Sequence, residues 1–184
     1  MAIADGIVKK TLIVPFINAG TDELPKYIRI KKSTTFPLSF SPEVQTFDYI
    51  SDETPTEELK SYKVALSQEL TMYKGEPDFE LIFDHVFNLK VGNDAKRKFI
   101  LAFMMEEGTS TTEMPAGTIY KAWEVEATIK VNTLDSVAQT ISFDLALNDP
   151  TKGAISVTDS EGELTPTFTE GTWDGAQFTP KAGK

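Results

Sequence analysis

The chain has 184 residues, of which 40% are hydrophobic, which is enough for one domain with an apolar core. Its formal net charge of −10 disfavours sequence-independent binding to nucleic acid, because an acidic surface repels phosphate. Cysteine is absent, which excludes disulfides and thiolate chemistry, and no apolar run approaches the roughly 18 residues of a membrane span. The start, MAIADGIVKK, lacks the regions of a signal peptide, so we expect assembly in a bacterial cytoplasm.

The first 50 residues predict short extended segments. Residues 1–25 combine glycines and prolines with scattered apolar side chains, a composition typical of an extended arm. Residues 27–31 alternate between apolar and polar side chains and predict a short strand. Pro37 and Pro42 interrupt the following stretch, after which residues 44–50 favour another strand.

The middle of the chain carries the clearest periodicity. Residues 51–60 are polar and acidic and predict a loop. Residues 62–72 alternate strictly, apart from Gln68 on the apolar side, and predict a strand with one buried face. Residues 77–89 begin with proline and repeat apolar side chains at helical spacing, so they predict a helix that covers a sheet.

The second half of the chain predicts long strands. Residues 99–105 are apolar at nearly every position, as expected for a strand covered on both faces. Residues 118–131 and 137–148 alternate and are joined by a short connection, which predicts an antiparallel hairpin. Residues 154–158 predict a short strand, and a polar tail follows.

This order of elements indicates a mainly β fold, an antiparallel β-sandwich or half-barrel with one packed α-helix. We expect a single domain over residues 1–184. It divides into an N-terminal arm (1–25), a β core with the helix at about 77–89 (26–149), and a C-terminal strand and arm (150–184).

Catalytic and metal-binding patterns are weak. His85 is the only histidine, and no nucleophile is indicated beside it, so an ordinary helical side chain is favoured over a catalytic base. Residues 159–163 with Glu170 resemble a calcium loop, but Leu164 occupies the position where such a loop needs glycine. A solvated turn is therefore favoured there. We expect no enzymatic activity, no cofactor and no metal site.

The two long strands of the predicted hairpin would extend about 40 Å at roughly 3.3 Å per residue, well beyond the usual length. Such strands present long edges that invite further pairing. Either the edges are covered within the chain, or they pair with identical copies. A ring that closes on itself removes the edges.

The region from Ser61 to Asp149 resembles the core of phage tail-tube (major tail) proteins. The resemblance consists of an amphipathic strand, SYKVALSQELTMYKG, the helix PDFELIFDHVFNL, the apolar strand KFILAFMM, and the long pair YKAWEVEATIKV and SVAQTISFDLALN. The segment LTPTFTEGTW is similar to the C-terminal arm of that family.

The resemblance implies a ring-forming tail-tube fold and a structural role in the virion. Hexameric rings would stack into a tube with a continuous inner β-barrel, the helix outside it, and loops and arms bridging adjacent rings. The tube would conduct DNA during ejection without binding it specifically. The implied partners are further copies of the chain, a tape-measure protein, and tail terminator and distal tail proteins, with no membrane.

Within such a tube, a lumen of hydroxyls and carboxylates would repel phosphate over about the 8 Å of physiological screening. Lys63 and Lys130 share the polar faces and weaken a purely acidic lumen, and an ordinary solvent-exposed face of a monomer remains the alternative. The candidate lumen-facing residues are Ser67, Glu69, Glu124, Glu126, Thr128, Ser142 and Asp144.

The acidic loop at 51–58 is the candidate for contact between rings, with a mobile surface loop as the alternative. The candidate inter-ring residues are Asp52, Glu53, Glu57 and Glu58.

Two rival functions remain open. The first is the tube of a contractile tail, a tailocin or a type VI-like secretion machine, which shares the same architecture. The second is a monomeric ligand- or glycan-binding β-barrel, in which Trp123 or Trp173 would line a pocket. Trp123 alternates with the apolar face, which favours a core position.

Overall fold

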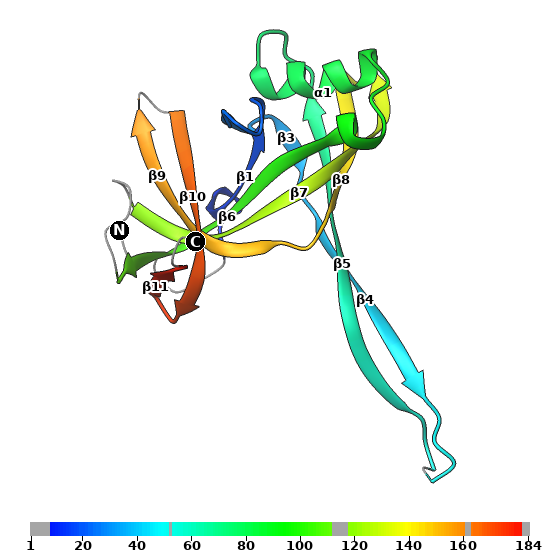
Figure 1. The fold of residues 1–184 in the computed structure, drawn as a ribbon. Coiled ribbons are helices and arrows are strands. Elements are labelled where there is room, and N and C mark those ends of the chain that lie inside the picture. Colours follow the sequence, from blue (N-terminus) through cyan, green and yellow to red (C-terminus); the bar gives the residue numbers. More distant parts are fainter. Residues whose placement is uncertain (1–7, 52, 112–117, 161–162, 182–184) are drawn as a thin grey trace.

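The structure, a computed structural model, describes residues 8–51, 53–111, 118–160 and 163–181, which form a mainly β fold with a mixed sheet and, in these ranges, one α-helix (Figure 1). The helical elements are η1 (Lys10–Leu12), α1 (Pro77–Phe87) and η2 (Gly92–Ala95). The strands are β1 (Ile13–Asn18), β2 (Tyr27–Arg29), β3 (Ser33–Thr35), β4 (Leu38–Phe47), β5 (Thr56–Thr71), β6 (Lys96–Ser110), β7 (Thr118–Asp135), β8 (Thr140–Leu147), β9 (Thr151–Ser160), β10 (Glu163–Asp174) and β11 (Gln177–Pro180).

The sheet is organised around β7. Along one edge, the first half of β7 pairs with β9 and the second half pairs with β8, while β6 pairs along the other edge. Strands β6, β11, β10, β9 and β7 form a closed circuit of pairings. Beyond β8 the sheet continues through β5 to β3 and β4, and beyond β6 through β1 to β2. Because each strand of this circuit pairs with a strand on either side, few strand edges stay unpaired at that end of the molecule.

One pairing departs from the expected antiparallel sheet. β11 runs parallel to the end of β6, where Gln177 and Phe178 pair with Thr109 and Ser110. The chain turns twice after β9, so that its last described strand returns beside β6 in the same direction as β6. The sheet is therefore mixed.

The core lies between α1 and one face of the sheet. Alternate residues of β5, β7 and β8 point to this face and are almost fully buried, Leu66 and Phe143 among them. The helix contributes Ile82, which is also buried, and half-buried apolar neighbours. The periodic patterns thus correctly predict the strand over 62–72, the helix, and the apolar strand over 99–105.

The start of α1 is fixed by a buried carboxylate. Asp78 is 3% exposed and accepts hydrogen bonds from the backbone N–H groups of Lys31 and Phe79, both at 2.9 Å. The bond from Lys31 ties the helix to the segment between β2 and β3, and the bond from Phe79 lies within the first turn of the helix. The helix ends at Phe87, two residues earlier than expected, and Leu89 then adopts a left-handed φ of 45°. No helix in the described ranges has the length and apolar character needed to cross a membrane.

The predicted hairpin over 118–148 is β7 and β8, but its turn lies further along the chain than expected. β7 continues to Asp135, whose Oδ1 accepts hydrogen bonds from the N–H groups of Val137 and Ala138. This side-chain bonding closes the turn locally. The turn ends at Gln139, which has a φ of 57°.

Both expected arms contain strands of the fold. On the N-terminal side, β1 pairs with β2 and β6, and Val14, Phe16 and Ile17 are at most 1% exposed. On the C-terminal side, β10 and β11 replace the expected polar tail, with Phe178 fully buried. These segments are extended, as their composition indicates, but sheet pairing holds them in the body.

The β4–β5 hairpin projects from the rest of the molecule (Figure 1). Residues 40–64 are here called the projecting hairpin. The pairing of β5 with β8 stops at Val64, so beyond the Phe40–Val64 pair the two strands of this hairpin pair only with each other among the described strands. The predicted loop over 51–60 is shorter than expected, because β5 begins at Thr56. Pro42 lies within β4, where it is tolerated because β4 is an edge strand.

Candidate functional site

The projecting hairpin carries an apolar face that the other described residues leave largely exposed. In β4, Phe40 and Val44 point to the same face as their partners in β5, Val64 and Leu59. A register shift after Glu43 places Leu59 opposite Val44 and so keeps the face apolar.

This apolar face continues the core face of the body. Along β5, Leu70 and Leu66 are at most 1% exposed, Val64 is half-buried, and Tyr62 is 55% exposed. The rings of Phe40 and Trp123 pack in a T-shaped arrangement with their centroids 6.4 Å apart, which joins the base of the hairpin to the body. The core stripe therefore extends beyond the elements that cover it, and large side chains remain in solvent.

The tip of the hairpin combines exposed apolar and acidic side chains. Phe47 and Tyr49 stack at 5.8 Å between ring centroids, and Ile50 is fully exposed. The predicted inter-ring residues Glu53, Glu57 and Glu58 are exposed at or beside this tip. The remaining one, Asp52, lies outside the described residues.

The sequence predicted a polar face on the long strands, and the structure brings all seven candidate residues to one face. Ser67 pairs with Asp144 and Glu69 with Ser142, while Asp144 also pairs with Lys130 of β7. From there the same face continues along β7 through its even-numbered residues. Those residues are Thr128, Glu126 and Glu124. This polar face lies on the side of the sheet opposite α1.

The carboxylates of the polar face are held by neighbouring side chains. Asp144 accepts hydrogen bonds from Ser67 Oγ at 2.5 Å and from Asn132 Nδ2 at 2.9 Å. These two bonds, with a smaller contribution from Lys130, lower the pKa of Asp144 below its usual value. Glu69 accepts a hydrogen bond from Thr34 Oγ1 at 3.0 Å. The face is thus ordered by cross-strand contacts.

The polar face carries mixed charge rather than carboxylates and hydroxyls alone. Lys130 was expected there, but pairing also brings Lys98 opposite Glu126 and Lys96 opposite Thr128. Lys96 Nζ lies 3.0 Å from Glu126 Oε1. The sequence could not assign Lys96 and Lys98 to this face. Residues 99–105 are apolar at nearly every position, so no alternation shows which face of the strand residues 96–98 occupy.

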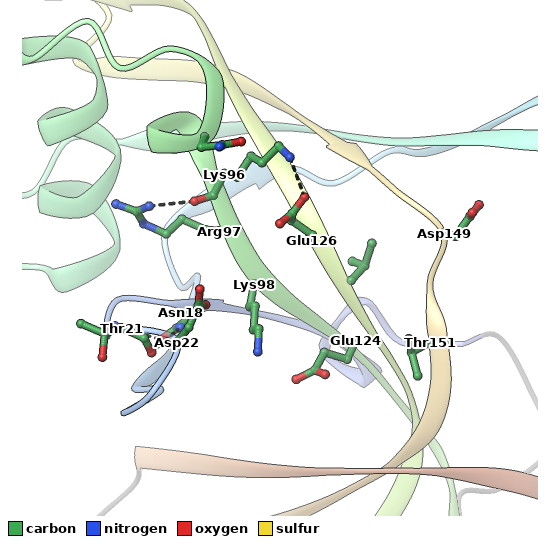
Figure 2. A pocket seen from close by; sticks show the side chains of 13 residues that line it. Asn18, Thr21, Asp22, Lys96, Arg97, Lys98, Glu124, Glu126, Asp149 and Thr151 are labelled. Atoms are coloured by element: carbon green, nitrogen blue, oxygen red, sulfur yellow. Dashed lines mark hydrogen bonds and ion pairs between the residues drawn. The ribbon is translucent and has the colours of Figure 1, made fainter.

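A polar groove of about 660 Å³ opens at the edge of this face (Figure 2). It is formed by the loop after β1, the start of β6, the middle of β7 and the link between β8 and β9. Figure 2 shows Lys98 between Glu124 on one side and Asn18, at the end of β1, and Asp22, in the loop after β1, on the other. Its lining includes acids and bases but neither histidine nor cysteine. The groove therefore brings opposite charges together, without a group whose usual pKa lies near neutrality.

Glu124, a candidate lumen residue, is bonded within this region. Tyr27 Oη donates a hydrogen bond to Glu124 Oε1 at 2.8 Å. Burial raises the pKa of Tyr27 well above its usual value, and the hydrogen bond to Glu124 and its negative charge raise it further. Tyr27 is therefore a neutral donor that fixes the Glu124 carboxylate.

His85 lies in a smaller groove of about 290 Å³ between α1 and the end of β7. The ring is 5% exposed, and the contact of Nδ1 with the Leu81 carbonyl at 2.8 Å identifies Nδ1 as the protonated nitrogen. Burial lowers the pKa of His85, and the charges of Arg97 and Lys90 lower it further. The side chain is thus a buried, neutral part of the helix–sheet contact.

The remaining candidate from the sequence is the calcium loop. The calcium candidate spans the connection from β9 to β10, and the side chains of residues 159–163 are outside the described part. Glu170 forms an ion pair with Lys181, whose Nζ lies 2.6 Å from Glu170 Oε1. Across the residues that the structure describes, no group of three His, Cys, Asp or Glu side chains is placed to hold a metal ion.

Neither tryptophan forms an exposed platform. Trp123 packs on Phe103 at 5.1 Å between ring centroids, in the core. Trp173 Nε1 donates a hydrogen bond to the Gly153 carbonyl at 2.8 Å, and its ring packs on Phe178. The residues on which a glycan-binding pocket would depend are therefore used in packing.

Comparison with models of known protein families gave no match, and comparison with curated proteins gave no significant match.

Proposed function

We propose that the chain is the structural subunit of a self-assembling tube, a phage tail-tube protein whose hexameric rings stack into a conduit for DNA. The observation that carries the proposal is the uncovered apolar face of the projecting hairpin. Phe40, Val44, Leu59 and Tyr62 are each about half exposed, and on the tip side of Val64 the strands β4 and β5 pair with no other described strand. Such a contiguous apolar patch is typical of a surface that binds another protein.

The energetics favour a second protein surface as the cover. Burying the exposed half of each of these side chains would contribute roughly 1 kcal/mol, or about 4 kcal/mol for the four. Every subunit of a closed ring would gain this contribution, because each carries one hairpin and one acceptor surface. A chain that remained monomeric would keep the patch in water.

The polar face supports the same proposal. The seven candidate lumen residues lie on one face, opposite α1, as a wall with an aqueous inner side and a helix outside would require. Carboxylates and lysines alternate there, so the face would offer phosphate no continuous positive track. In this proposal DNA passes without specific binding, and the tape-measure, tail terminator and distal tail proteins are the further partners.

The proposal is tested by the variant F40S/V44T/L59T/Y62T. We expect the variant to fold, because these side chains are already half in solvent, but to form fewer rings or tubes than the wild type. Light scattering and negative-stain microscopy of concentrated protein measure this. The matched control is L24S/V137T, which removes two exposed apolar side chains outside the hairpin and should assemble like the wild type.

Two results would contradict the proposal. One is a wild-type protein that stays monomeric at every concentration and with tail partners present. The other is a quadruple variant that assembles as well as the wild type.

A further inference from the structure

Strand β5 connects two ends of the molecule that differ in charge. Its 16 residues run from the tip of the projecting hairpin to the end that carries α1 (Figure 1). At about 3.3 Å per residue this separates the two ends by roughly 50 Å. The hairpin tip therefore lies far from the α1 end of its own chain.

The tip is strongly acidic. Asp48, Glu53, Glu57 and Glu58 are exposed, and no ion pair joins any of them to a described residue. Residues 48–59 include no lysine or arginine, and the nearest basic residue along the chain is the exposed Lys60. Further along the hairpin, Lys63 is paired with Glu43, at 3.7 Å. The four acids thus have no ion pair with a described residue, and they outnumber the neighbouring Lys60.

The opposite end carries a group of lysines, here called the basic rim: Lys31 and Lys32 between β2 and β3, and Lys74 between β5 and α1. All three are exposed, and the described residues offer them no ion pair. The two segments are joined, since the Thr71 N–H donates to the Lys32 carbonyl at 3.1 Å. Lys32 Nζ also lies 5.1 Å from the ring centroid of Tyr73.

Three acids also lie near the rim, but they are less exposed than its three lysines or stand at the N-terminal end of α1. Asp78 is buried and bonded to backbone N–H groups, and Glu76 is half-buried between Lys74 and the helix. Glu80 is exposed in the first turn of α1, where the helix dipole offsets a negative charge. The exposed part of the rim is therefore dominated by ammonium groups around the half-exposed ring of Tyr73.

We propose that the acidic hairpin tip of one copy docks on the basic rim of the next copy, in a head-to-tail contact that rests on the proposed tube function. Opposite charges select this pairing and disfavour tip-to-tip or rim-to-rim contacts. Tyr49 and Ile50 at the tip meet Tyr73 at the rim and add apolar contact. Because the two patches lie at opposite ends of one chain, the contact is head-to-tail and, in the proposed stack of rings, repeats along the tube axis.

A charge swap tests the docking directly. The rim variant K31E/K32E/K74E and the tip variant D48K/E53K/E57K should each raise the protein concentration at which tubes form by roughly tenfold or more, because like charges then face each other. An equimolar mixture of the two variants should assemble again, since each then offers what the other lacks. The chain that carries all six substitutions should also assemble. Circular dichroism checks that each variant is folded, and K10E/K152E is the control for reversal of exposed lysines elsewhere.

The outcomes separate this docking from the tube function itself. A wild type that never assembles overturns both. A wild type that assembles, with a rim variant that assembles equally well, overturns only the docking. Loss of assembly in both variants without recovery in the mixture also overturns it. Binding of duplex DNA by the wild type but not by the rim variant, with assembly unchanged, would identify the rim as an anion site instead.

Discussion

Asp144 shows what a sequence can and cannot indicate about one residue. Alternation in residues 137–148 placed it correctly on the polar side of its strand. The partners that fix it, Ser67 and Asn132, come from two other strands, and only the register of the sheet brings them together. The pKa of Asp144 is lowered by these bonds, so the charged form contributes to the stability of the fold.

This shift predicts a pH dependence. Because the folded pKa is depressed, the stabilisation is fully present above the unfolded pKa and is lost as the pH falls through the folded pKa. We expect Asp144→Asn to lower the free energy of unfolding by about 1 kcal/mol at pH 7 and to have much less effect near pH 3. Urea unfolding at both pH values measures the difference. An equal loss at both would show that the charge of Asp144 contributes nothing.

At the scale of elements, strict periodicity predicted β5, β7, β8 and α1, because one covered face imposes a repeat on the sequence. The sequence did not predict β10, because this strand is rich in threonine and contains glycine and proline, a composition that is typical of a polar tail. Pro42 suggested a break, yet β4 continues through it at a sheet edge. The apolar side chains of Phe40 and Val44 therefore belong to one strand that includes Pro42.

Because α1 covers the sheet with one side only, two of its residues should differ strongly in their contribution to stability. Ile82 is 1% exposed under the sheet, whereas Phe87 is 76% exposed at the end of the helix. We expect Ile82→Ala to lower the free energy of unfolding by about 3 kcal/mol, because it leaves a cavity in the core. Phe87→Ala should change it by no more than about 0.5 kcal/mol. Denaturant unfolding measures both, and similar losses would mean that α1 does not cover the core as described.

At the scale of the whole molecule, two surfaces have opposite character. The polar face is ordered and mixed in charge, while the projecting hairpin leaves apolar side chains in solvent. The sequence correctly grouped the polar residues on one face, since alternation fixes the face of each strand. The sequence could not show that the acidic segment at 51–58 lies at the end of a projecting hairpin. The hairpin projects because β4 and β5 continue beyond the end of β8, and the relative lengths of these strands follow only from the register of the sheet.

The charge of the polar face can be changed without touching the hairpin. We expect tubes of the variant E69K/E124K/E126K to form but to retain DNA, because three added lysines join Lys96, Lys98 and Lys130 on the same face. Co-sedimentation of tubes with labelled DNA at low salt, and DNA delivery by the assembled phage, measure this. The control E69Q/E124Q/E126Q removes the charges without reversing them and should bind much less DNA. Unaltered DNA passage through lysine-containing tubes would mean that this face does not line the lumen.

The central claim is that the apolar face of the projecting hairpin is covered by another copy of the chain. Cryo-electron microscopy of the concentrated wild-type protein tests this most directly. The account predicts rings or tubes in which Phe40, Val44, Leu59 and Tyr62 are buried against a neighbouring subunit. An assembly in which the hairpin stays in solvent, or a protein that remains a single chain with these side chains exposed, would contradict it.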